Sequence, residues 1–405
     1  MKNVAKVGLG VLTSIGGYLE VGSIGTALQA GARYRYGLLW ALAVGTVCVI
    51  FLTEMTGRLA AVSQHTVVDA IRKRFGVSFQ IWPLATQSVV DLFVLASEIG
   101  GAALALQLLT GASMRVWALP VALLVWALLW FGTFRAIEHS VATLGLITLC
   151  FAVAAVKLGP DWHEAVRNLV PHVSHRDPAQ YGYLAVAVLG ATISPYLITF
   201  YSSGGVEERM TPKDLLPNRI VAAVGMSFGS LVAMAIVVLA ALVLAPRGVR
   251  ADTYQESAFI LTIPFPRWGF ALFCTSLFIG CVGAALELAL DLAYIVSQSF
   301  GWDWGESQRP REEARFALVY TLALLVAPLP ALAGLDPLKL TMFSMAITVV
   351  ALPIVIGPLL VIMNDKQYLH AQTNGLLGNV AVMVIVALAF VLAVVAIPLQ
   401  ITGAR

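Results

Sequence analysis

A carboxylate, Glu20, stands between glycines in the stretch GGYLEVGS, inside the first long apolar run of the chain. A charge at mid-membrane costs at least about 2.5–3.5 kcal/mol on insertion scales, and it is usually tolerated where it faces a cavity, a partner or a transported ion. The flanking glycines each lower helix propensity by about 1 kcal/mol relative to alanine, so the helix is easily broken here. A broken helix frees backbone carbonyls, here near Val21 and Gly22, to bind a cation. We therefore expect Glu20 to hold a transported ion.

Two other interpretations of this stretch are open. Glu20 could pair with an arginine of another span, for which Arg58 is the candidate, and the glycines could serve close helix packing. A second interruption favours the ion-binding interpretation. In GATISPYL of the sixth apolar run, Pro195 lacks the N–H that a helix needs and its ring breaks the backbone ladder. Two broken helices five spans apart are typical of transporters built as two inverted repeats of five helices, with the substrate between the breaks.

A further acidic pair lies in the eighth apolar run, CVGAALELALDLAYIVSQ. Glu287 and Asp291 are four residues apart, so both carboxylates share one helix face. They could line a water-filled vestibule, or Asp291 could lie near the membrane surface. The sharper hypothesis is a second cation site, in which two close carboxylates raise each other's proton affinity and carry a proton.

The elements that position these residues must be membrane helices. The 405 residues are 59% hydrophobic and only 12% charged, against about 25% charged in an average soluble domain, and the mean hydropathy is +0.87. A bilayer core about 30 Å thick needs roughly 20 apolar residues per helix, which gives about eleven runs. Lipid permits only helices or closed barrels, and the runs lack the strict alternation of barrel strands. The sequence therefore predicts an all-α integral membrane protein. The expected spans lie near residues 5–31, 37–62, 79–109, 115–134, 140–158, 181–203, 217–245, 268–300, 316–334, 338–363 and 374–401.

We expect one transmembrane domain over residues 1–405, with a first repeat at about 5–158, a second at about 181–363 and an extra helix at 374–401. The first run has no convincing cleavage site and is interpreted as a retained span. Lysines and arginines cluster in loops of one side, which favours a cytoplasmic N-terminus. A net charge of +3 without a basic tract argues against nucleic-acid binding. The four cysteines all fall within spans and read as buried small residues.

Five segments carry a family likeness: GLGVLTSIGGYLEVGSIGTALQAGARYRYGLLW, FLTEMTGRLAAVSQHTVVDAIRKRFG, SEIGGAALALQLLTG, GATISPYLITFYSSGGVEE and GLDPLKLTMFSMAITVVALPIVIGPLLVIMND. They resemble the Nramp family of proton-coupled divalent metal transporters, and the likeness covers nearly the whole chain. It implies a LeuT-type fold, a five-plus-five inverted repeat with the ion held between the broken first and sixth helices.

The residues at the implied ion site depart from the family pattern. Typical members carry Asp-Pro-Gly-Asn where this chain has Glu20-Val21-Gly22-Ser23, and Met-Pro-His where it has Ser194-Pro195-Tyr196. The resemblance implies Glu20, Ser23 and Ser194 as metal ligands, helped by carbonyls such as that of Ala191.

Ser194 replaces a soft thioether, so the donors suit harder cations such as Mn²⁺ or Mg²⁺. Tyr196 replaces a histidine that could titrate near neutral pH, which puts proton coupling in doubt.

A proton path is implied only in part. Glu98, in SEIGG, matches a family acidic residue of the third helix associated with proton movement, but the acidic position one turn earlier is Leu95. We place Glu98, Glu287 and Asp291 on the expected coupling path.

The leading hypothesis is a secondary transporter of divalent cations working by alternating access, with H⁺ as a candidate coupling ion. The alternative is an Nramp-related transporter of a small anion such as bicarbonate, held at helix N-termini and coupled to a monovalent cation. The motifs GxxxxGK[ST] and HExxH are absent from the sequence, so we expect neither an enzyme nor a cofactor. We expect a monomer in a bacterial inner membrane, in contact with the lipid bilayer.

Overall fold

The computed structural model describes residues 20–132, 143–172, 177–305 and 310–401. Within these ranges every regular element is helical, as the sequence predicts. The first half holds α2 (Val21–Tyr34), α3 (Leu39–Ser63), α4 (Val67–Phe75), α5 (Val77–Thr110), α6 (Met114–Phe131), η1 (Leu146–Thr148), α8 (Leu149–Leu158) and α9 (Trp162–Arg167). The second half holds α10 (Pro178–Thr192), α11 (Pro195–Glu207), η2 (Pro212–Asp214), α12 (Leu215–Val243), η3 (Ala245–Arg247), α13 (Tyr254–Ser257), α14 (Gly269–Phe300), α15 (Ala314–Val326), α16 (Leu329–Leu332), α17 (Pro337–Met363), α18 (Lys366–Leu369), η4 (His370–Gln372) and α19 (Leu376–Ile401).

Eight helical segments of the described chain are long and apolar enough to cross a membrane. Two shorter apolar helices, Thr143–Leu158 and Leu376–Leu388, fall on two further predicted spans. The predicted first span begins outside the described residues, and its described part is α2. The prediction of a many-spanning helical membrane protein is confirmed.

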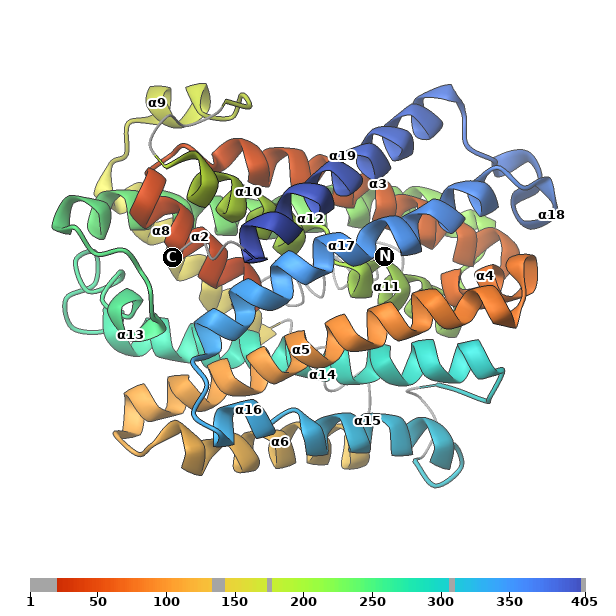
Figure 1. Cartoon of the computed structure of the whole chain (residues 1–405), viewed down its shortest axis with the longest axis horizontal. Coiled ribbons are helices and arrows are strands. Elements are labelled where there is room, and N and C mark those ends of the chain that lie inside the picture. The colour runs from red at the N-terminus through yellow and green to blue at the C-terminus, as the bar shows by residue number, and fades with distance from the viewer. Residues whose placement is uncertain (1–19, 133–142, 173–176, 306–309, 402–405) are drawn as a thin grey trace.

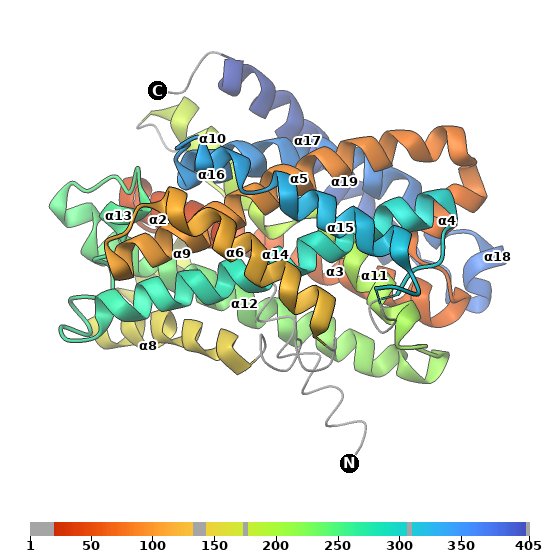
Figure 2. The same cartoon turned by 90° about the horizontal axis from the view of Figure 1, so that it is seen from below.

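The long helices pack around α5. Figure 1 shows α5 between α14 and α17, and contacts between these helices are among the most numerous in the molecule. The half-helix α2 packs against α12, α10 and α17. Short helices lie at the two ends of the bundle, α9 and α13 at one end and α4 and α18 at the other (Figures 1 and 2). Helix α2 therefore lies against full-length helices of the bundle.

Side-chain caps fix where several helices begin. Thr66 precedes α4 and accepts a hydrogen bond from the backbone N–H of Asp69 at 3.1 Å. Asp336 precedes α17 and accepts from the backbone N–H of Lys339 at 3.0 Å, with Pro337 as the first helical residue. An acceptor at the cap and a proline at the first position satisfy or remove donors that a helix start leaves unpaired.

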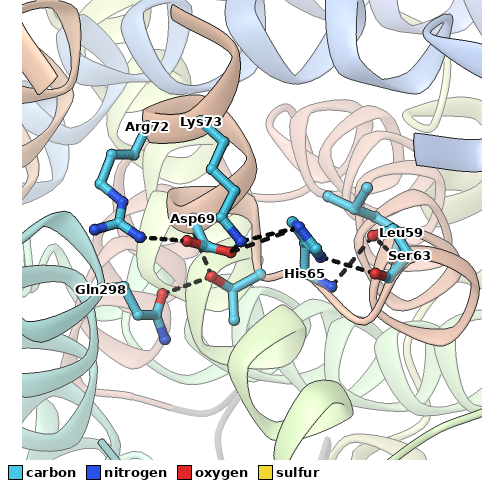
Figure 3. Close-up of polar contacts among 8 residues, drawn as sticks. Leu59, Ser63, His65, Asp69, Arg72, Lys73 and Gln298 are labelled. Carbon is cyan, nitrogen blue, oxygen red and sulfur yellow. Dashed lines mark hydrogen bonds and ion pairs between the residues drawn. The ribbon is translucent and has the colours of Figure 1, made fainter. Parts of the chain in front are cut away.

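A polar cluster joins α4 to α14 at one end of the bundle. Figure 3 shows Arg72 and Lys73 reaching Asp69, at 2.7 and 2.9 Å. Burial pushes the pKa of Asp69 upward, but the hydrogen bonds from Lys73 and Arg72 outweigh it and leave that pKa below its usual value. Beside this group, the Thr66 hydroxyl donates to the side chain of Gln298 on α14 at 2.8 Å. These contacts tie α4 to the end of α14.

Helix α10 packs against α17 without room for a side chain at Gly190. A Cβ at this position would overlap the backbone carbonyl oxygen of Met345 and lie 2.8 Å from a methyl group of Val349. Because a carbonyl cannot swing away as a long side chain can, the two helices can meet this closely only with glycine there.

We expect Gly190→Ala to lower the thermal melting temperature of the purified protein, because overpacking a close helix contact costs about 1–3 kcal/mol. Gly204→Ala on α11 is the matched control, since no atom outside its own helix turn lies within 4 Å of a Cβ there. Melting followed by size-exclusion chromatography in detergent compares the two. Equal melting temperatures for both variants would contradict this account of the α10–α17 contact.

Candidate ion-binding site

The predicted interruption at Pro195 is present. Helix α10 ends at Thr192 and α11 begins at Pro195, with Ile193 (φ −110°, ψ 72°) and Ser194 (φ −88°, ψ 133°) between them. Pro195 has no N–H, so it cannot donate to the carbonyl of Ala191 as a continuing helix would. The carbonyl end of α10, which carries partial negative charge, thus lies at the break.

The first helix is described from Glu20 onward. Glu20 has extended backbone angles (φ −85°, ψ 171°) and precedes the first helical residue, Val21. The Val21 N–H donates to both Glu98 carboxylate oxygens, at 3.1 and 3.3 Å, and its carbonyl accepts from the Tyr254 hydroxyl at 2.7 Å. Glu20 therefore lies at the positive end of α2, and the Val21 carbonyl already has a protein donor. Whether the helix also extends upstream lies outside the described residues.

The Glu20 side chain is buried, with 1% of its surface exposed, and neither carboxylate oxygen accepts a hydrogen bond of standard geometry. Its neighbour is Tyr196 on α11, whose hydroxyl is close enough to interact with the carboxylate. The Ser194 hydroxyl is equally buried and has no hydrogen-bond partner. Arg58, the alternative partner considered for Glu20, instead pairs with Glu54 at 3.3 Å. The helix starts and the break thus enclose a buried carboxylate and a buried hydroxyl, neither of which has a hydrogen bond of standard geometry.

A thioether that the sequence analysis did not identify also reaches this place. The sulfur of Met345, on α17, lies 2.8 Å from the position a Cβ on Gly22 would take, and Glu20 Oε1 lies 3.1 Å from the same position. Met345 is fully buried. The glycine at position 22 therefore leaves the space that the carboxylate and the sulfur share. A methionine in an apolar span gives no sequence signal, because it is an ordinary core residue.

The remaining residues expected at the site, Gly22, Ser23, Ala191 and Pro195, are also buried. Ser23 makes an interaction of its own. Among the described residues, no group of three or more histidine, cysteine, aspartate and glutamate side chains is arranged to hold a metal. The candidate site therefore offers one carboxylate, with hydroxyls, carbonyls and a thioether around it.

Glu98 lies directly behind Glu20. It is fully buried on α5, it accepts from Val21, and it contacts the thiol of Cys281 on α14. Its carboxyl group interacts electrostatically with those of Glu20 and Glu287. Glu98 thus links the start of α2 to α5 and α14. All four cysteines are free thiols; Cys48, Cys274 and Cys281 are buried as expected, whereas Cys150 is half-buried.

The two acidic residues of α14 have different surroundings. Glu287 is half-buried and its charge acts on Tyr196 and Glu98. Asp291, one turn further on, is fully buried and accepts hydrogen bonds from Thr199 on α11 and Gln87 on α5. Glu287 thus lies near the candidate ion site, whereas Asp291 lies against another acidic residue, Asp91 of α5.

Comparisons with known proteins identify the family and the fold of this chain. A family model described as natural resistance-associated macrophage protein-like (Nramp) matches residues 10–398. Divalent metal cation transporter MntH 1 of Pseudomonas aeruginosa is 33% identical over 53% of this chain and 49% of its own length. Divalent metal cation transporter MntH of Xanthomonas campestris pv. campestris is 26% identical over 98% of this chain and 89% of its own length. The chain spans about half the length of the first two curated relatives it matches.

Solved structures show the same fold. The manganese transporter of Eremococcus coleocola, solved with an aromatic bis-isothiourea compound, has a TM-score of 0.80 at 18% identity and covers 100% of this chain and 89% of its own. MhsT in complex with L-phenylalanine has a TM-score of 0.63 at 12% identity, covering 98% of each chain. With these neighbours the LeuT-type fold expected from the sequence is confirmed, and the chain is an integral, multi-pass membrane protein that belongs to the Nramp family.

Proposed function

We propose that this protein is a secondary transporter of divalent metal cations and that the ion binds between the start of α2 and the break between α10 and α11. The curated relatives are named divalent metal cation transporters, and the similar Eremococcus structure is of a manganese transporter. The ligands would be the Glu20 carboxylate, the hydroxyls of Ser194 and Ser23, and the carbonyl of Ala191.

The observation that carries the proposal is the unpaired, buried Glu20 carboxylate. Burying an ion without a partner costs several kcal/mol even after relaxation. The α2 N-terminus offsets part of this cost, since a carboxylate there gains up to about 2 kcal/mol in favourable partly buried positions. A bound dication would supply the rest by pairing directly with the carboxylate. The same ion would give the unpartnered Ser194 hydroxyl a role.

The donor set favours Mn²⁺ over Mg²⁺. Sequence alone suggested a site of hard oxygen ligands, because Ser194 stands where relatives carry a methionine. The Met345 sulfur beside Glu20 adds a thioether from α17. Carboxylate, hydroxyl and carbonyl ligands suit Mg²⁺ and Mn²⁺ alike, whereas a thioether adds affinity only for the softer metals. We propose a transition-metal substrate that includes Mn²⁺.

Transport would proceed by alternating access between two repeats, at about 5–158 and 181–363, that contribute one broken helix each. Val21 and Glu98 connect the first broken helix to α5, so movement of α5 would be transmitted to the ion site. We keep the prediction that the N-terminus is cytoplasmic and that H⁺ is a candidate coupling ion.

The small-anion alternative is not favoured. An anion would need the free N–H groups of helix N-termini, but at the start of α2 the Val21 N–H already donates to Glu98. Glu20 would also place a negative charge directly against the anion. The named relatives carry metal cations rather than anions.

Replacing Glu20 tests the site directly. We expect Glu20→Gln to lower Mn²⁺ affinity by more than about tenfold, equivalent to about 1.4 kcal/mol, because the amide removes the anionic ligand and keeps the shape. Isothermal titration in detergent and uptake into proteoliposomes would measure it. Glu20→Asp should retain part of the uptake, since it keeps the charge.

Glu312→Gln is the matched control, because Glu312 is an exposed carboxylate of the loop before α15. It should bind and transport Mn²⁺ as the unaltered protein does. If Glu20→Gln behaved like this control, with normal affinity and uptake, the ion site would have to be elsewhere.

The thioether is tested by Met345→Leu, which keeps the volume and removes the sulfur. We expect Cd²⁺ to inhibit Mn²⁺ uptake by the unaltered protein. In the variant this inhibition by Cd²⁺ should be much weaker, while Mn²⁺ uptake alone changes little. Competition by graded Cd²⁺ in the uptake assay measures this. Met363→Leu, at the far end of α17 and equally buried, is the matched control. If Cd²⁺ competed equally well in Met345→Leu, the sulfur would not be a ligand, and the sequence-based prediction of a site for hard cations would stand.

A further inference from the structure

A second pair of buried carboxyl groups lies away from the ion site, between α5, α11 and α14. Asp91 of α5 and Asp291 of α14 are both fully buried, and their side chains are close enough to be hydrogen-bond partners. They are brought together by the long contact between α5 and α14, which Figure 1 shows running side by side. Sequence spacing had suggested Glu287 as the partner of Asp291.

The donors around this pair are unequally shared. Gln87 donates through its amide nitrogen to Asp291 Oδ2 at 2.9 Å and to the Thr199 oxygen at 2.7 Å. The Thr199 hydroxyl has a single hydrogen, and the acceptor closest to it is Asp291 Oδ1, at 2.8 Å. Each oxygen of Asp291 thus has a protein donor, whereas neither oxygen of Asp91 accepts a hydrogen bond of standard geometry.

A proton bound by one of the two carboxyl groups would make their close contact favourable. Two carboxylates in contact cannot both be ionised in a buried site, because each charge destabilises the other and neither has water to solvate it. Asp291 is furnished with donors and suits the charged form. Asp91 accepts no hydrogen bond of standard geometry, although Gln87 lies close to it, and when protonated Asp91 becomes a donor and can donate to Asp291.

We propose that Asp91 and Asp291 form a proton-binding site, with the proton on Asp91 in this state of the protein, and that its release is part of the transport cycle. The link to transport rests on the proposed function. The proton moves between the pair and water without any other reactant.

Thr199 connects the proton site to the ion site. Its hydroxyl lies 3.1 Å from the carbonyl of Tyr196 and 3.3 Å from that of Pro195, in the first turn of α11. If the charge of Asp291 changes, the Thr199 hydroxyl can donate its hydrogen bond to one of these carbonyls instead of to Asp291. Helix α11 begins at the break, so a change in its first turn reaches Ser194 and the bound ion.

Other titratable groups lie on the helices packed against the pair. Of these groups, Glu20 is the one whose charge also reaches Asp91. On α5, Glu98 faces Val21; on α14, Glu287 faces Tyr196, and Tyr294 donates to Glu207 of α11. Basic residues of the adjoining helices have other neighbours than this pair. Arg72 and Lys73 of α4 pair with Asp69, and Arg33 of α2 pairs with Asp252. Arg115 of α6 lies against Gly334, Arg315 of α15 lies over the Trp302 ring, and Lys339 of α17 is exposed.

Infrared spectroscopy tests protonation without requiring transport. At neutral pH the unaltered protein should show the carbonyl stretch of a protonated carboxyl group that Asp91→Asn removes. Asp303→Asn, which removes an exposed carboxylate, should leave the band in place. If Asp91→Asn does not fold, Asp291→Asn provides the second variant, because loss of the acceptor should shift the band of Asp91. A spectrum unchanged by either substitution overturns the proposal.

Uptake into proteoliposomes tests coupling. For one proton per metal ion, each pH unit of imposed gradient should change Mn²⁺ accumulation by the unaltered protein about tenfold. Asp91→Asn should abolish that response and the accompanying proton influx, read with an internal pH dye, while Mn²⁺ binding by titration stays intact. Asp303→Asn again serves as the control.

Two outcomes overturn the proton assignment. One is a variant Asp91→Asn with normal proton influx and gradient response. The other is accumulation that follows a Na⁺ gradient and loses this dependence in Asp91→Asn, which would make the pair a sodium site. Failure of the unaltered protein to bind Mn²⁺ would instead reject the proposed metal transport, and the infrared band would still report on the pair.

Discussion

The interior of this membrane protein is shaped by the cost of burying carboxyl groups. Four of them, Glu20, Asp91, Glu98 and Asp291, are at most 1% exposed within the bundle. In the described part of the chain, every ion pair of a lysine or arginine involves some other acidic residue. The buried groups must therefore be stabilised by hydrogen-bond donors, by protons or by a bound cation.

Each of these carboxyl groups is stabilised in a different way. Glu98 accepts the first N–H of α2, and Asp291 accepts from Thr199 and Gln87. Glu20 and Asp91 accept no hydrogen bond of standard geometry, but Asp91 lies against Asp291, whereas Glu20 lies beside the Tyr196 hydroxyl. We attribute this difference to their tasks, since a metal site must present a charge that no protein group already neutralises. The start of α2 and the break between α10 and α11 make this possible, because they bring helix ends to the candidate site.

The sequence was informative where a single residue was of a type that its segment does not normally contain. Hydropathy predicted the spans, and Pro195 predicted the break of the sixth helix. Glu20 was predicted to be functional because it is a charged residue in an apolar run. Met345 and the pairing of Asp91 with Asp291 could not be predicted, because they depend on which faces of α5, α14 and α17 meet. Helix α17 is apolar on all sides, so no periodicity marks the face that carries Met345. Helical spacing placed Glu287 and Asp291 on one face, but packing against α5 gave them different partners.

Anomalous diffraction from crystals grown with Mn²⁺ tests the central claim most directly, because it locates the ion without relying on activity. The account predicts a single strong peak in contact with the Glu20 carboxylate, between the start of α2 and Ser194 at the break, with the Met345 sulfur beside it. A peak elsewhere in the bundle, with the Glu20 carboxylate still unpaired, would contradict it.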